Sequence, residues 1–156
     1  MSPDGFDGGM STRYVAVVGP GEATTSQEAV AGEVGRLLAE AGAIVVCGGL
    51  GGVMQAAARG AWDAGGITVG ILPGDNRTDA NPYLAVSLPT GLGEARDALV
   101  VRAADSLIAV GRGHGTLAEI AYALKARTPV IGLDTWEIEG VQAVGLPDDA
   151  VRRALT

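Results

Sequence analysis

Short, continuously apolar segments alternate along this chain with segments whose apolar residues recur at helical spacing. The expected strands are residues 14–18, 43–47, 68–72, 84–88, 106–110, 130–133 and 141–144. The expected helices begin at a cap on Thr25 or Ser26 and then at residues 53, about 93, 116 and 148. Strands that are apolar throughout need cover on both faces, which helices between parallel strands provide. The alternation therefore predicts an α/β fold, a three-layer, Rossmann-like, doubly wound parallel sheet.

The chain has 156 residues, enough to bury about 70% of the surface that its unfolded form exposes. We expect one domain over residues 13–156 and a disordered tail over residues 1–12, with Met10 as an alternative start of translation. The tail has acids and glycines where a signal peptide has basic and apolar residues. No apolar run reaches the roughly 18 residues of a membrane helix, so no membrane partner is expected.

Charge and cysteine content exclude several classes of protein. The net charge of −7 repels the phosphates of nucleic acids and of anionic membranes, so no nucleic-acid partner is expected. Cys47 is the only cysteine, which rules out an internal disulfide and any multi-cysteine zinc site. A single free cysteine fits a reducing compartment, and we expect a cytoplasmic protein.

Three glycine-rich turns follow strands of the predicted sheet. They contain Gly19 and Gly21, the glycines from Gly48 to Gly52, and the glycines from Gly111 to Gly115. Ligands of doubly wound folds bind beyond the carboxyl ends of the strands, where the strand order reverses, so we expect the three turns to meet at one crevice. The alternative is that these glycines only allow the chain to turn tightly.

The third turn carries the strongest indication of a ligand. The segment from Gly111 to Glu119 reads GRGHGTLAE, follows an apolar strand and opens a helix. Unpaired N–H groups in the first helical turn, together with the helix dipole, favour an anion, and glycines let it approach the backbone. This predicts a phosphorylated small molecule as the partner. The structural alternative is a capping box, in which Thr116 caps the helix and Glu119 bonds back to it.

Common nucleotide and hydrolase motifs are missing from the sequence. The segment 19–24 reads GPGEAT, which lacks the third glycine of the dinucleotide fingerprint, and the second strand ends without the acid that binds a ribose. Neither GxxxxGK[ST] nor GxSxG occurs. These findings argue against an NAD enzyme, a P-loop NTPase and a hydrolase with a nucleophile elbow.

The chain resembles the Lonely Guy (LOG) family of the SLOG superfamily over residues 14–133. The resemblance is carried by GxGTxxE at 113–119, by Arg96 before it, by GGVM at 51–54 and by AGG at 64–66. Members of this family, once mislabelled lysine decarboxylases, cleave the N-glycosidic bond of nucleoside 5′-monophosphates. The resemblance implies a homodimer or homotetramer that needs no metal and no cofactor for hydrolysis.

By position, Arg96 and Glu119 match the residues that the LOG enzymes use in catalysis. A ribosyl C–N bond breaks through an oxocarbenium-like state, which a carboxylate stabilises or supplies with an activated water. The resemblance gives this role to Glu119, while Arg96 holds phosphate or ribose. Gly113, Gly115 and Thr116 are expected to donate N–H and hydroxyl hydrogen bonds to the ligand.

Arg112 and His114 occupy variable or altered places in this loop. The family signature begins Pro-Gly-Gly, and here Arg112 replaces a glycine, so that it either pairs with a phosphate or blocks its approach. His114 either acts as an acid or base near neutral pH or contacts the edge of the ligand. The expected binding set also contains the turn glycines Gly19, Gly21, Gly51, Gly52 and Gly111.

Three functions remain open from the sequence. The main hypothesis is a phosphoribohydrolase acting on a nucleoside 5′-monophosphate, because both catalytic positions are filled. The alternative is a non-catalytic carrier of the molybdenum cofactor, since the segments 47–74 and GLDTW at 132–136 are similar to a short branch that includes such carriers. The third hypothesis is a regulatory nucleotide sensor.

Overall fold

A single seven-stranded sheet with helices on both faces makes up residues 11–156, the part of the chain that the computed structural model describes. The expected tail over residues 1–12 lies outside the described residues, except for Ser11 and Thr12. The strands are β1 (Tyr14–Val18), β2 (Ile44–Cys47), β3 (Thr68–Leu72), β4 (Val86–Pro89), β5 (Ser106–Val110), β6 (Val130–Leu133) and β7 (Val141–Val144). The helices are α1 (Thr25–Glu40), α2 (Val53–Asp63), α3 (Asp97–Arg102), α4 (His114–Lys125) and α5 (Pro147–Ala154), with short 3-10 helices η2 (Arg77–Asp79) and η3 (Gly93–Arg96).

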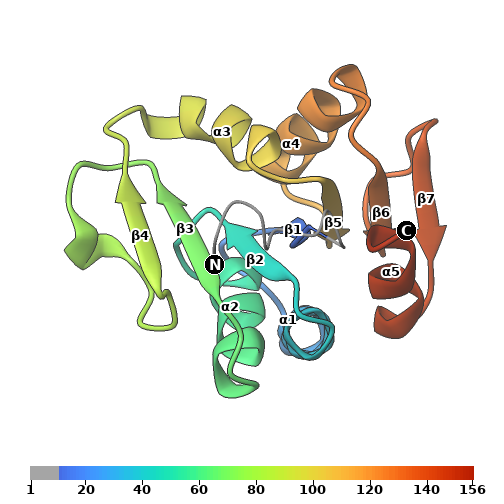
Figure 1. The fold of residues 1–156 in the computed structure, drawn as a ribbon. Coiled ribbons are helices and arrows are strands. Elements are labelled where there is room, and N and C mark those ends of the chain that lie inside the picture. The colour runs from blue at the N-terminus through green and yellow to red at the C-terminus, as the bar shows by residue number, and fades with distance from the viewer. Residues whose placement is uncertain (1–10) are drawn as a thin grey trace, which may run out of the picture.

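All seven strands are parallel, in the order β4-β3-β2-β1-β5-β6-β7 (Figure 1). The chain starts at the centre, builds the sheet outward to β4, and then returns to the other side of β1 to form β5. The strand order therefore reverses between β1 and β5, where Val15 pairs with Ser106. This arrangement confirms the predicted doubly wound sheet and places its crevice beyond the carboxyl ends of these two strands.

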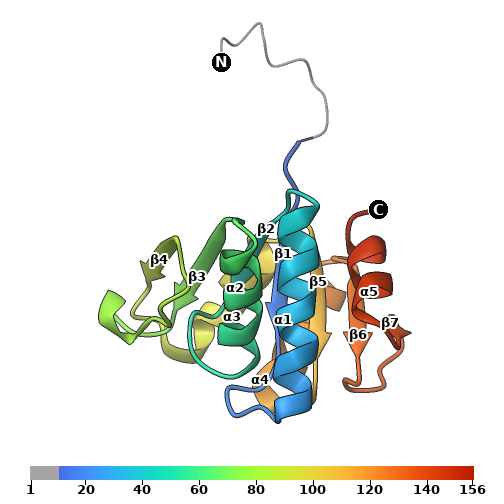
Figure 2. The same cartoon turned by 90° about the horizontal axis from the view of Figure 1, so that it is seen from below.

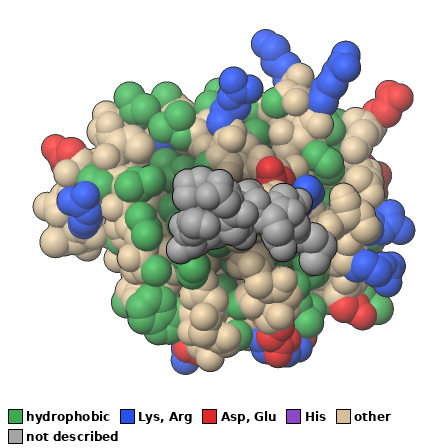
Figure 3. Space-filling view, viewed as in Figure 1, with side chains coloured by type: hydrophobic (Ala, Val, Ile, Leu, Met, Phe, Trp, Pro, Cys, Tyr) green, Lys and Arg blue, Asp and Glu red, His purple; other side chains and the backbone are tan. Residues whose placement is uncertain are grey.

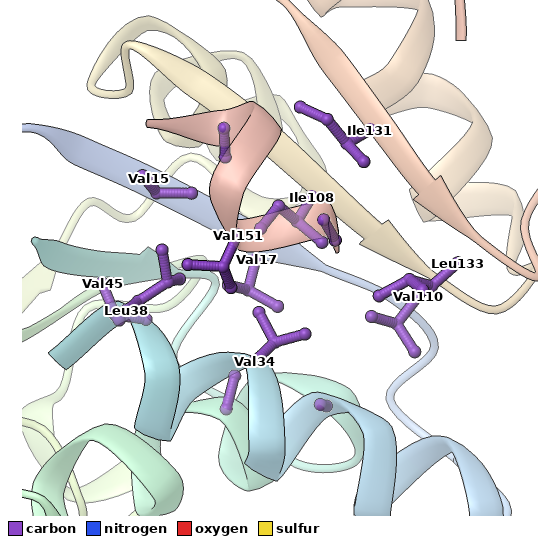
Figure 4. Packing of buried hydrophobic residues seen from close by; sticks show 14 of the residues in the cluster. Val15, Val17, Val34, Leu38, Val45, Ile108, Val110, Ile131, Leu133 and Val151 are labelled. Atoms are coloured by element: carbon purple, nitrogen blue, oxygen red, sulfur yellow. The ribbon is translucent and has the colours of Figure 1, made fainter. Parts of the chain in front are cut away.

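Helices cover the sheet on both faces, as the apolar strands require (Figures 1 and 2). One face carries α1, α2 and α5, and the other carries α3 and α4. Successive side chains of β1 point to opposite faces, so Val15 and Val17 join one core cluster while Ala16 and Val18 join the other. Figure 4 shows the first cluster, in which Val34 and Leu38 of α1 pack against the sheet.

Small residues bring α1 and α2 unusually close to each other. A Cβ atom on Gly35 would lie 2.0 Å from the carbonyl oxygen of Ala57, and one on Gly60 would lie 2.0 Å from that of Gly32. Both distances are far below a van der Waals contact, so only glycine fits at these two positions. A hydrogen bond from Val53 N to Pro20 O at 3.1 Å also holds the amino-terminal end of α2 beside the turn that follows β1.

Some boundaries differ from those expected. The first helix is capped by Thr24 rather than by Thr25 or Ser26, because the side chains of Thr24 and Gln27 each accept a hydrogen bond from the other's backbone N–H. The helix expected from residue 93 starts as η3 and becomes α-helical only at Asp97. The strand expected at 84–88 spans Val86–Pro89. None of the described helices combines the length and the hydropathy needed to span a membrane.

Candidate functional site

A cleft of about 260 Å³ opens beyond the carboxyl ends of β1 and β5. It is formed by the turn after β1, the start of α2, the junction of η3 with α3, and the start of α4. Its lining residues are Gly19, Pro20, Gly21, Met54, Arg96, Asp97, Gly113, His114, Gly115, Thr116 and Glu119. The cleft thus lies at the point where the strand order reverses, which is where ligands bind in this class of fold.

The amino-terminal end of α4 forms one side of the cleft. Gly113 is the N-cap and has no side chain to cap the helix. The first bond inside the helix runs from Leu117 N to Gly113 O at 2.9 Å. The N–H groups of His114, Gly115 and Thr116 therefore have no acceptor within the helix. They line the cleft together with the positive end of the helix dipole, which favours an anion there.

The turn after β1 lies opposite this helix end. A Cβ atom on Gly19 would lie 2.4 Å from Val110 O and 2.7 Å from the Cβ of Val53, so a larger residue cannot occupy the turn. Gly21 also lines the cleft. A Cβ atom on Gly113 would lie only 3.5 Å from the Cα of Pro20, so the two turns face each other directly.

Residues at the end of β6 and just after it hold the loop between β5 and α4 in place. The hydroxyl of Thr135 donates to Gly111 O at 2.7 Å, and the indole N–H of Trp136 donates to Gly113 O at 3.0 Å. Gly111 N in turn donates to Leu133 O at 3.1 Å. These bonds fix the backbone on both sides of Arg112, so the donors at the start of α4 are preorganised.

Four polar side chains, each less than a tenth exposed, form the floor of the cleft. Arg96 forms an ion pair with Asp97 and donates to Gly48 O at 3.4 Å. Glu119 is 7% exposed and lines the same cleft. Thr116 is 2% exposed, and within residues 11–156 neither its hydroxyl nor the Nε atom of Arg96 has a hydrogen-bond partner. Buried polar groups are normally hydrogen-bonded, so these two unpaired groups leave hydrogen-bonding capacity available to a polar molecule in the cleft.

Burial changes the ionisation of this floor. Loss of water contact raises the pKa of Glu119 to about 7, and the positive charge of Arg96 opposes this effect. Burial lowers the pKa of Arg96, and the negative charge of Glu119 raises it in part. Glu119 therefore changes its charge close to neutral pH, a property common among functional carboxyl groups. The fully buried Cys47 lies nearby, and burial raises the pKa of its thiol to about 11.

Comparison with known proteins identifies the family. The model of the SLOG cluster4 family matches residues 12–153. The chain belongs to the SLOG cluster4 family. It is 38% identical over 148 residues to an uncharacterised protein of Archaeoglobus fulgidus, and the match covers 94% of this chain and 97% of that protein.

Two solved structures similar to this SLOG cluster4 protein have named ligands. The molybdenum cofactor binding protein from the phototrophic bacterium Rippkaea orientalis is 35% identical, with a TM-score of 0.87 and coverage of 92% of this chain and 96% of that one. The molybdenum cofactor carrier protein of Chlamydomonas reinhardtii is 34% identical, with a TM-score of 0.83 and the same coverage. The expected relationship to the SLOG superfamily and to its cofactor-carrier branch is thus confirmed.

The SLOG cluster4 fold brings most of the sequence-predicted site residues together. Eight of them line the cleft: Gly19, Gly21, Arg96, Gly113, His114, Gly115, Thr116 and Glu119. The structural alternative, a capping box between Thr116 and Glu119, does not form, because α4 begins at His114 with Gly113 as its N-cap, and both residues line the cleft. Arg96, which by itself suggested an exposed helix residue, is 8% exposed.

Four expected binding residues do not line the cleft. Arg112 is half-exposed and lies 3.5 Å from the carboxylate of Asp134, so it neither enters nor blocks the cleft. Gly111 packs against Gln27, where a Cβ would lie 2.7 Å from its side-chain nitrogen. Gly51 and Gly52 lie behind the β1 turn, and a Cβ on Gly52 would lie 2.3 Å from Pro20 O. These glycines pack closely against the elements that surround the cleft.

Three lining residues are not among those that the sequence predicts: Pro20, Met54 and Asp97. A signal for Asp97 existed, since it directly follows Arg96, but a charged residue at a helix start is usually explained by the helix dipole. Gly48 was missed as a support. A Cβ there would lie 2.8 Å from a guanidinium nitrogen of Arg96, so glycine at this position makes room for that side chain.

The cleft combines an anion-binding half with a polar half. The backbone N–H groups at the start of α4 suit phosphate oxygens, and Arg96, Asp97, Thr116 and Glu119 provide hydrogen-bond donors and acceptors beside them. In residues 11–156 no group of three or more His, Cys, Asp or Glu side chains is arranged to hold a metal ion. The arrangement suits a molecule that carries a phosphate and a hydrogen-bonding polar part.

Proposed function

We propose that this protein binds the molybdenum cofactor and carries it without chemical change. The observation that supports the proposal is the pair of buried, unpartnered polar groups, the Thr116 hydroxyl and the Arg96 Nε, that lie with the Glu119 carboxyl in the cleft beside the free helix end of α4. The similarity to two cofactor-binding proteins, at 34–35% identity over 92% of the chain, selects the ligand among phosphorylated molecules.

The residues present in the cleft fit the chemistry of this cofactor, a phosphorylated pterin. Its phosphate would accept hydrogen bonds from the N–H groups of His114, Gly115 and Thr116. Its nitrogen-rich ring system carries N–H donors for the carboxylate of Glu119 and acceptors for the hydroxyl of Thr116. A volume of about 260 Å³ is below the roughly 300–1,000 Å³ of typical ligand pockets, so part of the molecule would extend past the cleft mouth.

The proposal is tested with cofactor released from a molybdenum enzyme. The protein is incubated with it and desalted, and the retained molybdenum is measured by mass spectrometry and the retained pterin by its fluorescence after oxidation. We expect one equivalent of each on the wild type. Thr116→Val keeps the size of the side chain but removes its hydroxyl, and it should weaken binding about fivefold or more. Thr78→Val, at an exposed threonine of η2, is the matched control.

The outcome of this experiment is decisive in both directions. Retention of molybdenum and pterin, weakened by Thr116→Val and unchanged by Thr78→Val, supports a carrier that uses the cleft. No retention on the wild type under anaerobic conditions would reject the cofactor as the ligand. Equal retention on all three proteins would place the cofactor elsewhere on the molecule.

A second function, hydrolysis of nucleoside 5′-monophosphates, is favoured by one observation. The Glu119 carboxyl, with its pKa near 7, shares the cleft floor with Arg96. Such a carboxyl can activate water towards the C1′ atom of a ribose as the C–N bond breaks. Chromatography of a panel of nucleotides should then show free base and ribose 5-phosphate, and Glu119→Gln should abolish their release. If all the nucleotides stay intact, hydrolysis is rejected and the carrier function is the one that remains.

A further inference from the structure

His114 provides an aromatic ring at the mouth of the cleft. It is the first residue of α4 and is exposed, and no other aromatic residue lines the cleft among the residues described. Its backbone N–H belongs to the anion-binding helix end, and its side chain therefore lies next to any group attached to a phosphate bound there. The position suits contact with the part of a ligand that extends past the small cleft.

The imidazole ring is held in a defined orientation from behind. It stacks on the indole of Trp136, with ring centroids 6.3 Å apart and an angle of 19° between the planes. Trp136 is itself fixed through its hydrogen bond to Gly113 O at 3.0 Å, and the preceding Thr135 is bonded to Gly111 O. A nearly parallel, offset pair is a favourable aromatic arrangement, so the ring is preorganised before any ligand arrives.

We infer that His114, backed by Trp136, is a stacking platform for a planar, nitrogen-rich ring of the bound ligand. The inference rests on the proposed function for the location of the phosphate, and it assigns the contact that selects a flat ring over an open-chain or sugar phosphate. Met54 lines the same cleft, and its flexible thioether is a favourable neighbour for an aromatic ring. His114 is thus a specificity residue that contacts the ligand.

A histidine in an anion site also has a competing role, in which its charge attracts the phosphate. The two roles predict different effects of substitution. His114→Phe keeps a flat ring and removes any charge or hydrogen bond, whereas His114→Ala removes the ring altogether. A platform tolerates phenylalanine, and an electrostatic or acid–base role does not.

The experiment measures binding of GMP and of ribose 5-phosphate, which share a phosphate and a ribose but differ in the ring. Titrations use a Trp62→Phe background, so that Trp136 is the only tryptophan and reports on its stacked partner. The wild-type platform should bind GMP about tenfold more tightly than ribose 5-phosphate and change the Trp136 emission. Chromatography after each titration verifies that GMP is intact.

The variants separate the possible results. His114→Ala should lose most of the preference for GMP while ribose 5-phosphate binds as before, and His114→Phe should keep the preference. The platform would be overturned if the wild type bound the two probes equally. It would also be overturned if His114→Ala and His114→Phe each weakened the binding of GMP and of ribose 5-phosphate to the same extent. Retention of the molybdenum cofactor by the wild type with no change in His114→Ala would overturn the platform and leave the carrier function intact. A preference for GMP without retention of the cofactor would reject the carrier function and leave the platform intact.

Discussion

At the scale of single residues, the burial of Glu119 makes the stability of the protein depend on pH. Its pKa is raised from an ordinary value of 4.5 to about 7, so the folded protein holds a proton that the unfolded chain has released between these values. The contribution of Glu119 to stability is therefore fully present below pH 4.5 and is lost as the pH rises from there through the folded-state pKa of about 7. The pKa difference corresponds to at most about 3 kcal/mol.

Glu119→Gln should remove this dependence, because an amide of the same shape does not ionise. At pH 8 we expect the variant to exceed the wild type in free energy of unfolding, by up to about 3 kcal/mol, and at pH 5 by less than about 1 kcal/mol. Urea unfolding at the two pH values measures the difference. Glu137→Gln, at an exposed carboxyl after β6, is the control. Parallel pH profiles for wild type and Glu119→Gln would contradict a raised pKa.

The residues of the floor also show what sequence alone can predict at this scale. The family resemblance predicts Arg96, Thr116 and Glu119 as site residues, but their burial, and the unpaired Arg96 Nε and Thr116 hydroxyl, depend on how α3 and α4 pack, which no local pattern encodes. The direction of the Arg112 side chain depends on packing in the same way. Its place in the signature suggested a ligand contact, whereas the turn directs its side chain to Asp134.

At the scale of secondary-structure elements, the packing of α1 on α2 depends on two glycines. Gly35→Ala and Gly60→Ala each place a Cβ atom 2.0 Å from a backbone carbonyl oxygen, so the helices must separate. Alanine is the better helix former by about 1 kcal/mol, but overpacking outweighs this gain, and we expect each variant to lose about 1–3 kcal/mol of stability.

Gly32 offers the matched control on the same helix. A Cβ atom there would lie 3.6 Å from Ala56 O, an ordinary contact, so Gly32→Ala should stabilise the protein by about 0.5–1 kcal/mol. Thermal and urea unfolding of the three variants measure the contrast. If Gly35→Ala were as stable as Gly32→Ala, the close packing of these helices would not hold in solution.

Most elements were predictable because the apolar periodicity of strands and helices is local. The boundaries that failed are those set by backbone geometry or by side-chain hydrogen bonds. Gly91 and Gly93 have positive φ, 66° and 60°, so the α-helical conformation of α3 starts later than expected. The N-cap of α1 is Thr24 because its side chain and that of Gln27 form a capping box. Neither effect alters the pattern of apolar residues from which the elements were predicted.

At the scale of the whole molecule, the order of the strands decides which glycine turns meet. The sequence predicts that three turns share one crevice, yet the turns after β1 and β5 line it while Gly51 and Gly52 lie behind. All three turns are similarly rich in glycine. Only the position of β1 and β5 on either side of the reversal distinguishes them, and that position follows from contacts between distant strands.

The apolar surface of the molecule bears on the expected homodimer or homotetramer, which stays a prediction. The sequence suggests an apolar face on Leu99, Val100 and Leu124, but Val100 is fully buried and Leu124 is half-buried. The exposed apolar side chains of the α3 and α4 layer are Leu99 at 40% and Tyr122 at 45%. A second apolar area lies at the free edge of β4, where Figure 3 shows hydrophobic side chains gathered and where Leu88 is 46% exposed.

Two substitutions decide between these surfaces. A charge introduced at the centre of a self-association interface costs far more than one at a free surface, so only the variant that lies in the interface should dissociate the assembly. Light scattering after gel filtration should give a multiple of the chain mass for the wild type.

We expect Leu99→Glu to reduce that mass, because two packed helices offer a broader apolar face than one short edge strand. We expect Leu88→Glu to leave the mass unchanged. Trp62→Glu, on α2 in the opposite helical layer, is the control. The reverse pattern would place the interface at β4, and a wild-type mass of one chain would reject the expected assembly.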